Sequence, residues 1–160
     1  MKLCNFHARD EQDTDCLGAA LAALLADGTV VALVGTLGAG KTRLVQAVAD
    51  ASGIDPRDVV SPTFVVIHEY RGHRPIYHFD AYRMKDDDEF LQLGPEEYFE
   101  GQGVTFVEWA DRVELCLPQN YVQIEISIGE TTARNFVICA VGTGFDDLVA
   151  KIDATLNKCS

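Results

Sequence analysis

Residues 35–42, Gly-Thr-Leu-Gly-Ala-Gly-Lys-Thr, match the pattern G-x-x-x-x-G-K-[ST] at every fixed position. The continuous apolar run at residues 30–34 precedes them, and such a run is typical of a strand covered on both faces in a parallel sheet. Residues 41–51 follow with apolar side chains at helical spacing, and Gly53 ends that pattern. The sequence therefore predicts a phosphate-binding loop that joins a buried strand to a helix.

The residue types in this loop suit a ligand that carries several negative charges. Glycines let the backbone turn its N–H groups inward as a nest, and the following helix N-terminus adds unpaired donors and its dipole. Lys41 is expected to reach the β- and γ-phosphates, and the Thr42 hydroxyl is expected to ligate Mg²⁺. The residues predicted to hold the nucleotide here are Gly35, Leu37, Gly38, Ala39, Gly40, Lys41 and Thr42.

Two apolar stretches that end in an acid could complete such a site. Residues 104–108 end in Glu108, and residues 76–80 end in Asp80, although the second stretch contains a histidine. Ligands of open α/β sheets bind at the carboxyl ends of strands, where a carboxylate can hold a metal or its waters. A helix cap or a surface ion pair is the alternative for each acid. The residues alone leave open which acid touches the metal.

Three further residues are candidates for contacts with the ligand. Thr63 lies in a Ser-Pro-Thr break after the loop helix, where a switch segment could sense the γ-phosphate, or where an ordinary turn could lie. Trp109 is the single tryptophan and follows Glu108 directly, so it either lines the pocket or packs in the core. Arg83 is close enough in sequence to Asp80 to stabilise phosphate charge, or to pair with surface acids instead.

Charge and composition exclude several other classes of protein. The chain has 160 residues and a formal net charge of −12, which disfavours broad nucleic-acid binding. Its longest uncharged stretch, residues 28–40, is rich in glycine, so no membrane span is expected. The first ten residues lack the apolar core of a secretory signal. Five scattered cysteines without a C-x-x-C pair are expected to be reduced thiols in the cytoplasm.

The remaining pattern predicts one α/β domain that spans residues 1–160 and has a mixed sheet. Helices and strands alternate early in the chain, and hairpins follow later. The expected elements are a helix capped by residues 13–15, a hairpin of strands 64–70 and 76–79, strands 104–107, 121–128 and 136–141, and a last helix capped by residues 146–147.

Phosphate loops occur in GTPases, in small-molecule kinases and in nucleotide-gated binding modules, and composition and spacing leave the last two classes open. Residues 150–153 miss the guanine-reading pattern [NT]-K-x-D at its first position, so ATP is the expected nucleotide rather than GTP. A small-molecule kinase remains an alternative, although Arg112 and Arg134 are well apart and do not resemble the paired arginines of a kinase lid. The third class is a nucleotide-gated binding module. In such a protein ATP turnover resets a bound partner, and no separate substrate is needed.

Five ordered motifs together resemble the TsaE family, the bacterial ATPases of tRNA threonylcarbamoyladenosine synthesis. They are G-T-L-G-A-G-K-T at 35–42, S-P-T-F at 61–64, H-F-D-A-Y-R at 78–83, L-G-P-E-E-Y-F at 93–99 and V-E-W at 107–109. The loop alone is shared by many families, whereas the ordered set is far more specific. Two positions depart from the family pattern, Thr36 where Asp is usual and Arg43 where Thr or Ser is usual.

The resemblance implies a three-layer phosphate-loop domain that binds ATP and Mg²⁺ and hydrolyses ATP weakly by itself. It implies two partners, the threonylcarbamoyl-transferring subunit and its inactive paralogue, which are proteins of the TsaD and TsaB type. Contact with tRNA would be indirect, through that complex, and the modified base would be the adenosine beside the anticodon.

The resemblance also implies roles for individual residues. Lys41, Asp80 and Glu108 would be catalytic, with Thr42 and Glu108 as metal ligands and Asp80 organising water or metal. The residues implied to lie at the nucleotide outside the loop are Thr63, Trp109 and Arg134.

Overall fold

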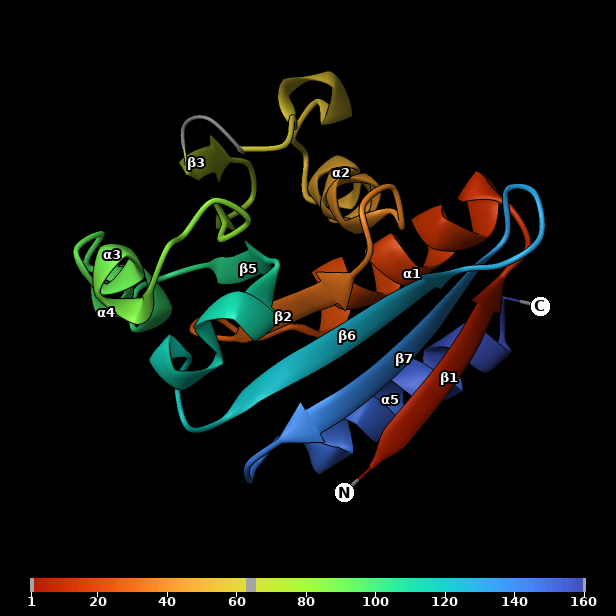
Figure 1. The fold of residues 1–160 in the computed structure, drawn as a ribbon. Helices are drawn as coiled ribbons and strands as arrows, with labels where there is room; N and C mark the ends of the chain where they lie inside the picture. Colours follow the sequence, from red (N-terminus) through yellow and green to blue (C-terminus); the bar gives the residue numbers. More distant parts are fainter. Residues whose placement is uncertain (1, 63–65, 160) are drawn as a thin grey trace.

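The computed structural model describes residues 2–62 and 66–159, and these contain one seven-stranded sheet with helices on both faces (Figure 1). The strands are β1 (Leu3–Ala8), β2 (Val30–Gly35), β3 (Ile67–Arg71), β4 (Pro75–Asp80), β5 (Val104–Glu108), β6 (Tyr121–Ile128) and β7 (Arg134–Val141). The helices are α1 (Glu11–Leu24), α2 (Lys41–Ala51), α3 (Asp87–Leu91), α4 (Pro95–Phe99) and α5 (Asp146–Asn157), with 3₁₀ turns η1 (Pro56–Asp58) and η2 (Ala110–Cys116).

The strand order is β1-β7-β6-β2-β5-β4-β3, and the sheet is mixed as the sequence predicts. The four central strands β6, β2, β5 and β4 run parallel to one another. The outer strands β7, β1 and β3 pair antiparallel with their neighbours. Because β2, β5 and β4 are parallel, their carboxyl ends all reach the same edge of the sheet.

The alternation of side chains in β2 divides the core into two layers. Val31 and Leu33 pack with α1, α2 and α5 on one face, and Val30 and Ala32 pack with α3, α4 and η2 on the other. All four side chains are buried, which explains why the run is continuously apolar rather than alternating. The loop at residues 36–40 directly follows β2, so it lies at the carboxyl ends of the parallel strands.

Several element boundaries differ from the predicted ones for local reasons. Helix α1 is capped by Asp10, whose side chain accepts a hydrogen bond from the Asp13 amide, so the helix begins before the predicted cap. Strand β3 begins at Ile67 because Val66 has a left-handed backbone, with φ of +79°. Strand β1 was not predicted at all, and it pairs along its whole length with β7.

The expectation that all five cysteines are reduced is wrong for one pair. Cys16 in α1 and Cys159 after α5 form a disulfide across 143 residues of sequence. The other three cysteines are free, with Cys4 buried and Cys116 and Cys139 half-buried. The number of cysteines, five, could not reveal this disulfide, because the disulfide depends on α1 and α5 packing against each other.

No helix among residues 2–62 and 66–159 has the length and apolar character needed to cross a membrane.

The contact between α1 and α2 depends on Gly18, which permits close approach of the two helices. A Cβ at this position would lie 2.4 Å from the Ala47 Cβ and 2.6 Å from the Ala47 carbonyl carbon. Overpacking of this kind costs about 1–3 kcal/mol, so we expect Gly18→Ala to lower the measured free energy of unfolding by up to about 2 kcal/mol in denaturant titrations. This overpacking outweighs the gain in helix propensity of about 1 kcal/mol.

Ala19 provides the matched control, because it is the next residue in α1 and is exposed. Ala19→Gly should cost only the propensity difference of about 1 kcal/mol. A Gly18→Ala protein more stable than the parent would contradict the close approach of α1 and α2.

Candidate functional site

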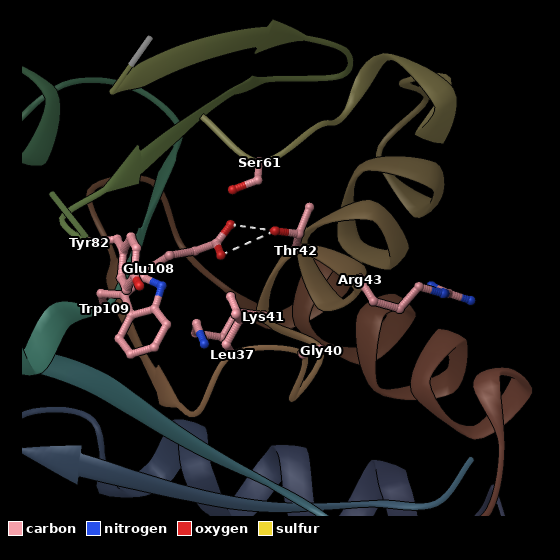
Figure 2. Close-up of a pocket in the computed structure, with 10 residues that line it drawn as sticks. Leu37, Gly40, Lys41, Thr42, Arg43, Ser61, Tyr82, Glu108 and Trp109 are labelled. Carbon is pink, nitrogen blue, oxygen red and sulfur yellow. Dashed lines mark hydrogen bonds between the residues drawn. The ribbon is translucent and has the colours of Figure 1, made fainter. Parts of the chain in front are cut away.

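The loop between β2 and α2 presents its backbone to a cavity at the edge of the sheet (Figure 2). Gly35 cannot carry a side chain, since a Cβ would lie 2.6 Å from the Ile126 carbonyl oxygen. Gly40 immediately precedes α2 with φ of +112°, and no side chain in the described part of the chain caps the first amides of this helix. Those N–H groups therefore remain available to an anionic ligand, and the helix dipole favours one.

Lys41 lies almost fully buried beside this loop, with 4% of its surface exposed. Its ammonium donates to the carbonyl oxygens of Gly35 at 2.7 Å and Thr36 at 3.0 Å. It also lies 4.0 Å from the centre of the Trp109 ring. Burial lowers the pKa of Lys41, and the charge of Glu108 partly opposes that shift.

Glu108 ends β5 directly opposite Thr42, in the first turn of α2. The Thr42 hydroxyl lies 2.8 Å from Oε2 and 3.1 Å from Oε1 of the carboxylate, and it donates to that group (Figure 2). Oε2 is also hydrogen-bonded to Nε2 of His78, a residue of β4. Glu108 is 2% exposed, so these contacts and the nearby Lys41 stabilise a carboxylate that water hardly reaches.

Asp80 ends the neighbouring strand β4 and is in register with Glu108. The Ser61 hydroxyl donates to Oδ2 at 3.2 Å, and the Tyr82 amide donates to Oδ1 at 2.8 Å. The two acids therefore lie side by side at the same sheet edge, as the sequence predicts from parallel strands.

The cavity in front of these groups has a volume of about 310 Å³. Trp109 forms one wall of the cavity and also packs against the core, and its left-handed φ of +58° turns the chain as it leaves β5. The Tyr82 and Trp109 rings pack with their centres 4.8 Å apart, and the Arg112 guanidinium lies over both rings. The lining residues are Leu37, Gly38, Gly40, Lys41, Thr42, Arg43, Ser61, Tyr82, Glu108 and Trp109.

A second cavity of about 240 Å³ adjoins the other side of the loop and shares Gly38, Gly40 and Arg43 with the first. Arg134 lines it and donates from Nε to the Ala39 carbonyl oxygen at 3.0 Å. Arg134 thus holds the loop in place through a hydrogen bond, and it also lines the second cavity. Arg43 points away from Thr42 and Glu108, toward α1, where it forms an ion pair with Asp15 at 2.8 Å (Figure 2).

The donor set at Thr42 and Glu108 fits Mg²⁺ in one particular way. Over the described residues, no group of three or more His, Cys, Asp or Glu side chains could hold a metal by itself. Mg²⁺ is commonly bound by one or two carboxylates together with phosphate oxygens and waters, rather than by an all-protein cage. One hydroxyl and one carboxylate beside a phosphate-binding loop therefore suit a metal that arrives with its nucleotide.

The structure brings most predicted site residues together. Lys41, Thr42, Glu108 and Trp109 line one cavity, and Asp80 lies beside Glu108. Leu37 lies at the rim with 77% exposure, and Ala39 is buried behind the loop. Thr63 lies outside the described residues. Sequence reasoning missed the contact of His78 with Glu108, although a histidine inside an apolar strand was a visible signal.

Comparison with known proteins gives consistent matches. The family model "Threonylcarbamoyl adenosine biosynthesis protein TsaE" matches residues 8–136. The tRNA threonylcarbamoyladenosine biosynthesis protein TsaE of Bacillus subtilis is 40% identical over 153 residues, covering 95% of each chain. That of Treponema pallidum is 38% identical over 121 residues, 76% of this chain and 89% of the relative. The crystal structure of Bacillus subtilis YdiB superposes with a TM-score of 0.82 at 36% identity, covering 96% of this chain and 95% of that one.

The lowered pKa of Lys41 predicts that this lysine costs stability. A lysine pKa below the ordinary 10.5 means that the fold holds the proton less tightly than the unfolded chain does. The cost is present at neutral pH and fades as pH rises toward the ordinary pKa. Lys41→Met keeps the buried stem, so we expect its free energy of unfolding at neutral pH to equal or exceed that of the parent.

Denaturant titrations of both proteins across that pH range measure the difference directly. The advantage of Lys41→Met should shrink as the solution becomes alkaline. A loss of more than about 1 kcal/mol at neutral pH would show instead that the contacts of the ammonium stabilise the fold.

Proposed function

The chain belongs to the TsaE family of threonylcarbamoyl adenosine biosynthesis proteins, and on this premise we propose that it binds ATP with Mg²⁺ and hydrolyses it during formation of threonylcarbamoyladenosine in tRNA. The observation that carries the proposal is the contact of Thr42 with Glu108 beside an uncapped loop and helix N-terminus. An oxygen pair at that position suits a metal bound to phosphate.

The loop amides and Lys41 bind the phosphates in this proposal. Lys41 exchanges its contacts with the Gly35 and Thr36 carbonyl oxygens for phosphate oxygens, which are better partners for an ammonium because they are charged. Thr42 and Glu108 would hold Mg²⁺, which would neutralise charge on the β- and γ-phosphates.

Asp80 positions the attacking water. Its Oδ1 is fixed by the Tyr82 amide and its Oδ2 by Ser61, so the carboxylate has a defined orientation beside Glu108. A carboxylate held in this way accepts a hydrogen bond from water. The water is then oriented so that a lone pair of the water oxygen points toward the phosphorus.

The second cavity is the proposed place for the nucleoside. It adjoins the loop at Gly38 and Gly40, and the side chains of Thr132 and Arg134 line it as well. Arg134 on the same wall holds the loop through Ala39, so loop and base site are joined by one side chain.

A tRNA-modifying role is compatible with the acidic surface if partners hold the RNA. The net charge of −12 disfavours direct tRNA binding at physiological salt. We therefore propose that the chain works with the threonylcarbamoyl-transferring subunit and its inactive paralogue, which contact the tRNA. The alternative of a small-molecule kinase lacks support, since Arg112 covers aromatic rings and Arg134 holds the loop.

Substitutions should separate nucleotide binding from turnover. Lys41→Met removes a charged contact to phosphate, so we expect nucleotide affinity to fall about 10- to 100-fold in a calorimetric titration. Asp80→Asn and Glu108→Gln keep the size and hydrogen-bonding atoms of the carboxylates, so ATP should still bind. Phosphate release by these two variants should fall by about 100-fold or more.

The exposed carboxylate of Glu97 in α4 gives the matched control, and Glu97→Gln should leave both measurements unchanged. Parental turnover in all three site variants would refute the proposal.

Adding the two partners should raise the rate of phosphate release by this chain. The expected cause is that the complex, rather than a separate small-molecule acceptor, couples ATP turnover to work. The assay compares phosphate release by the chain alone, with each partner, and with both. A phosphorylated small molecule found in a metabolite screen, without stimulation by the partners, would favour the kinase alternative.

A further inference from the structure

His78 is completely buried in β4 and is hydrogen-bonded at both ring nitrogens. Nε2 is bonded to Oε2 of Glu108, and Nδ1 lies 3.2 Å from the Tyr70 hydroxyl. A buried imidazole costs free energy unless both nitrogens have partners, and here both have them. The ring is therefore held in one orientation by two polar contacts.

Packing alone does not account for a histidine at this position. Ile76 lies on the same face of β4, and Phe106 is the in-register neighbour of His78 in β5; both are buried and apolar. A hydrocarbon side chain would fill the same space without desolvating a polar ring. The histidine is therefore explained by its polar partners, Glu108 and Tyr70, rather than by the apolar packing around the ring.

The partners of the ring define which nitrogen donates to the carboxylate. A carboxylate only accepts hydrogen bonds, so Nε2 carries the proton given to Glu108. The Tyr70 hydroxyl is the hydrogen-bond partner of Nδ1 on the other side of the ring. Burial raises the pKa of Tyr70 to about 12, so its hydroxyl keeps its proton at neutral pH and can donate.

The two oxygens of Glu108 are unequally engaged as a result. Oε2 is bonded to His78 and to Thr42, whereas Oε1 has, among residues 2–62 and 66–159, only the longer contact of 3.1 Å with Thr42. Rotation of the carboxylate about its last bond would break the contact with His78. The imidazole therefore holds Oε2 in place and leaves Oε1 as the oxygen with the weaker contact.

We propose that His78 is a positioning residue for hydrolysis, which orients the Glu108 carboxylate so that it can hold Mg²⁺ beside Thr42. This inference rests on the proposed ATPase function. Groups that hold a metal-binding side chain in place typically contribute about 10- to 100-fold in metal affinity or activity. Tyr70 supports the ring from its other side, and its hydroxyl also lies 3.4 Å from the Val60 carbonyl oxygen.

The test uses three substitutions at one position in the full chain. In His78→Gln the terminal amide nitrogen takes the place of Nε2 and can still donate to Glu108. In His78→Asn the side chain is shorter and cannot reach Glu108, although it is equally polar. In His78→Leu neither contact remains. His73→Leu, in the exposed hairpin loop between β3 and β4, is the control for loss of a histidine outside the site.

Two measurements distinguish positioning from a merely structural role. The first is the Mg²⁺ concentration that gives half-maximal phosphate release at saturating ATP. We expect this concentration to rise about 10- to 100-fold in the Asn and Leu variants, and to stay within about threefold of the parent in the Gln variant. The second is ATP affinity in the presence of EDTA, which should be unchanged in all of them.

Each outcome bears on the inference. Parental Mg²⁺ dependence in the Asn and Leu variants overturns it, as does an equal loss in the Gln and Asn variants. The inference is also overturned if the variants lose ATP affinity in EDTA to the same extent as they lose phosphate release, since that pattern indicates a disturbed fold. If the Leu variant does not fold, the contrast between Gln and Asn decides alone. Failure of the proposed function is distinct, because the parent itself would then release no phosphate.

Discussion

A carboxylate buried at the end of a central parallel strand is the constraint on which the site depends. Glu108 has almost no contact with water, so its charge must be compensated within the protein. The Thr42 hydroxyl, the His78 ring and the nearby Lys41 ammonium provide that compensation from three different elements. The order of β2, β5 and β4 in the sheet is what brings these elements to one edge.

The same arrangement places unfavourable features where a ligand would relieve them. Lys41 is buried with a lowered pKa, Trp109 has a left-handed backbone, and no side chain of the described residues caps the first amides of α2. Such features are tolerated at functional sites when the surrounding structure holds them in place. A polyphosphate would pair with both the ammonium and the amides, so ligand binding should recover part of this cost.

Local sequence was sufficient to predict the loop, its helix and the two acids. The helical spacing of residues 41–51 and the strand-ending positions of Asp80 and Glu108 are local signals, and the structure agrees with each. Such local signals could not predict which distant segments of the chain pair with one another. Strand β1 depends on β7, and the Cys16–Cys159 disulfide depends on the packing of α1 and α5. The contact of Arg134 with Ala39 likewise depends on the strand order, which local signals do not give.

A crystal structure of the chain with a non-hydrolysable ATP analogue and Mg²⁺ tests the central claim most directly. The account predicts phosphates surrounded by the amides of residues 36–42, with Lys41 turned toward them and the metal contacting the oxygens of Thr42 and Glu108. A nucleotide bound elsewhere, or a metal in contact with neither residue, would contradict it.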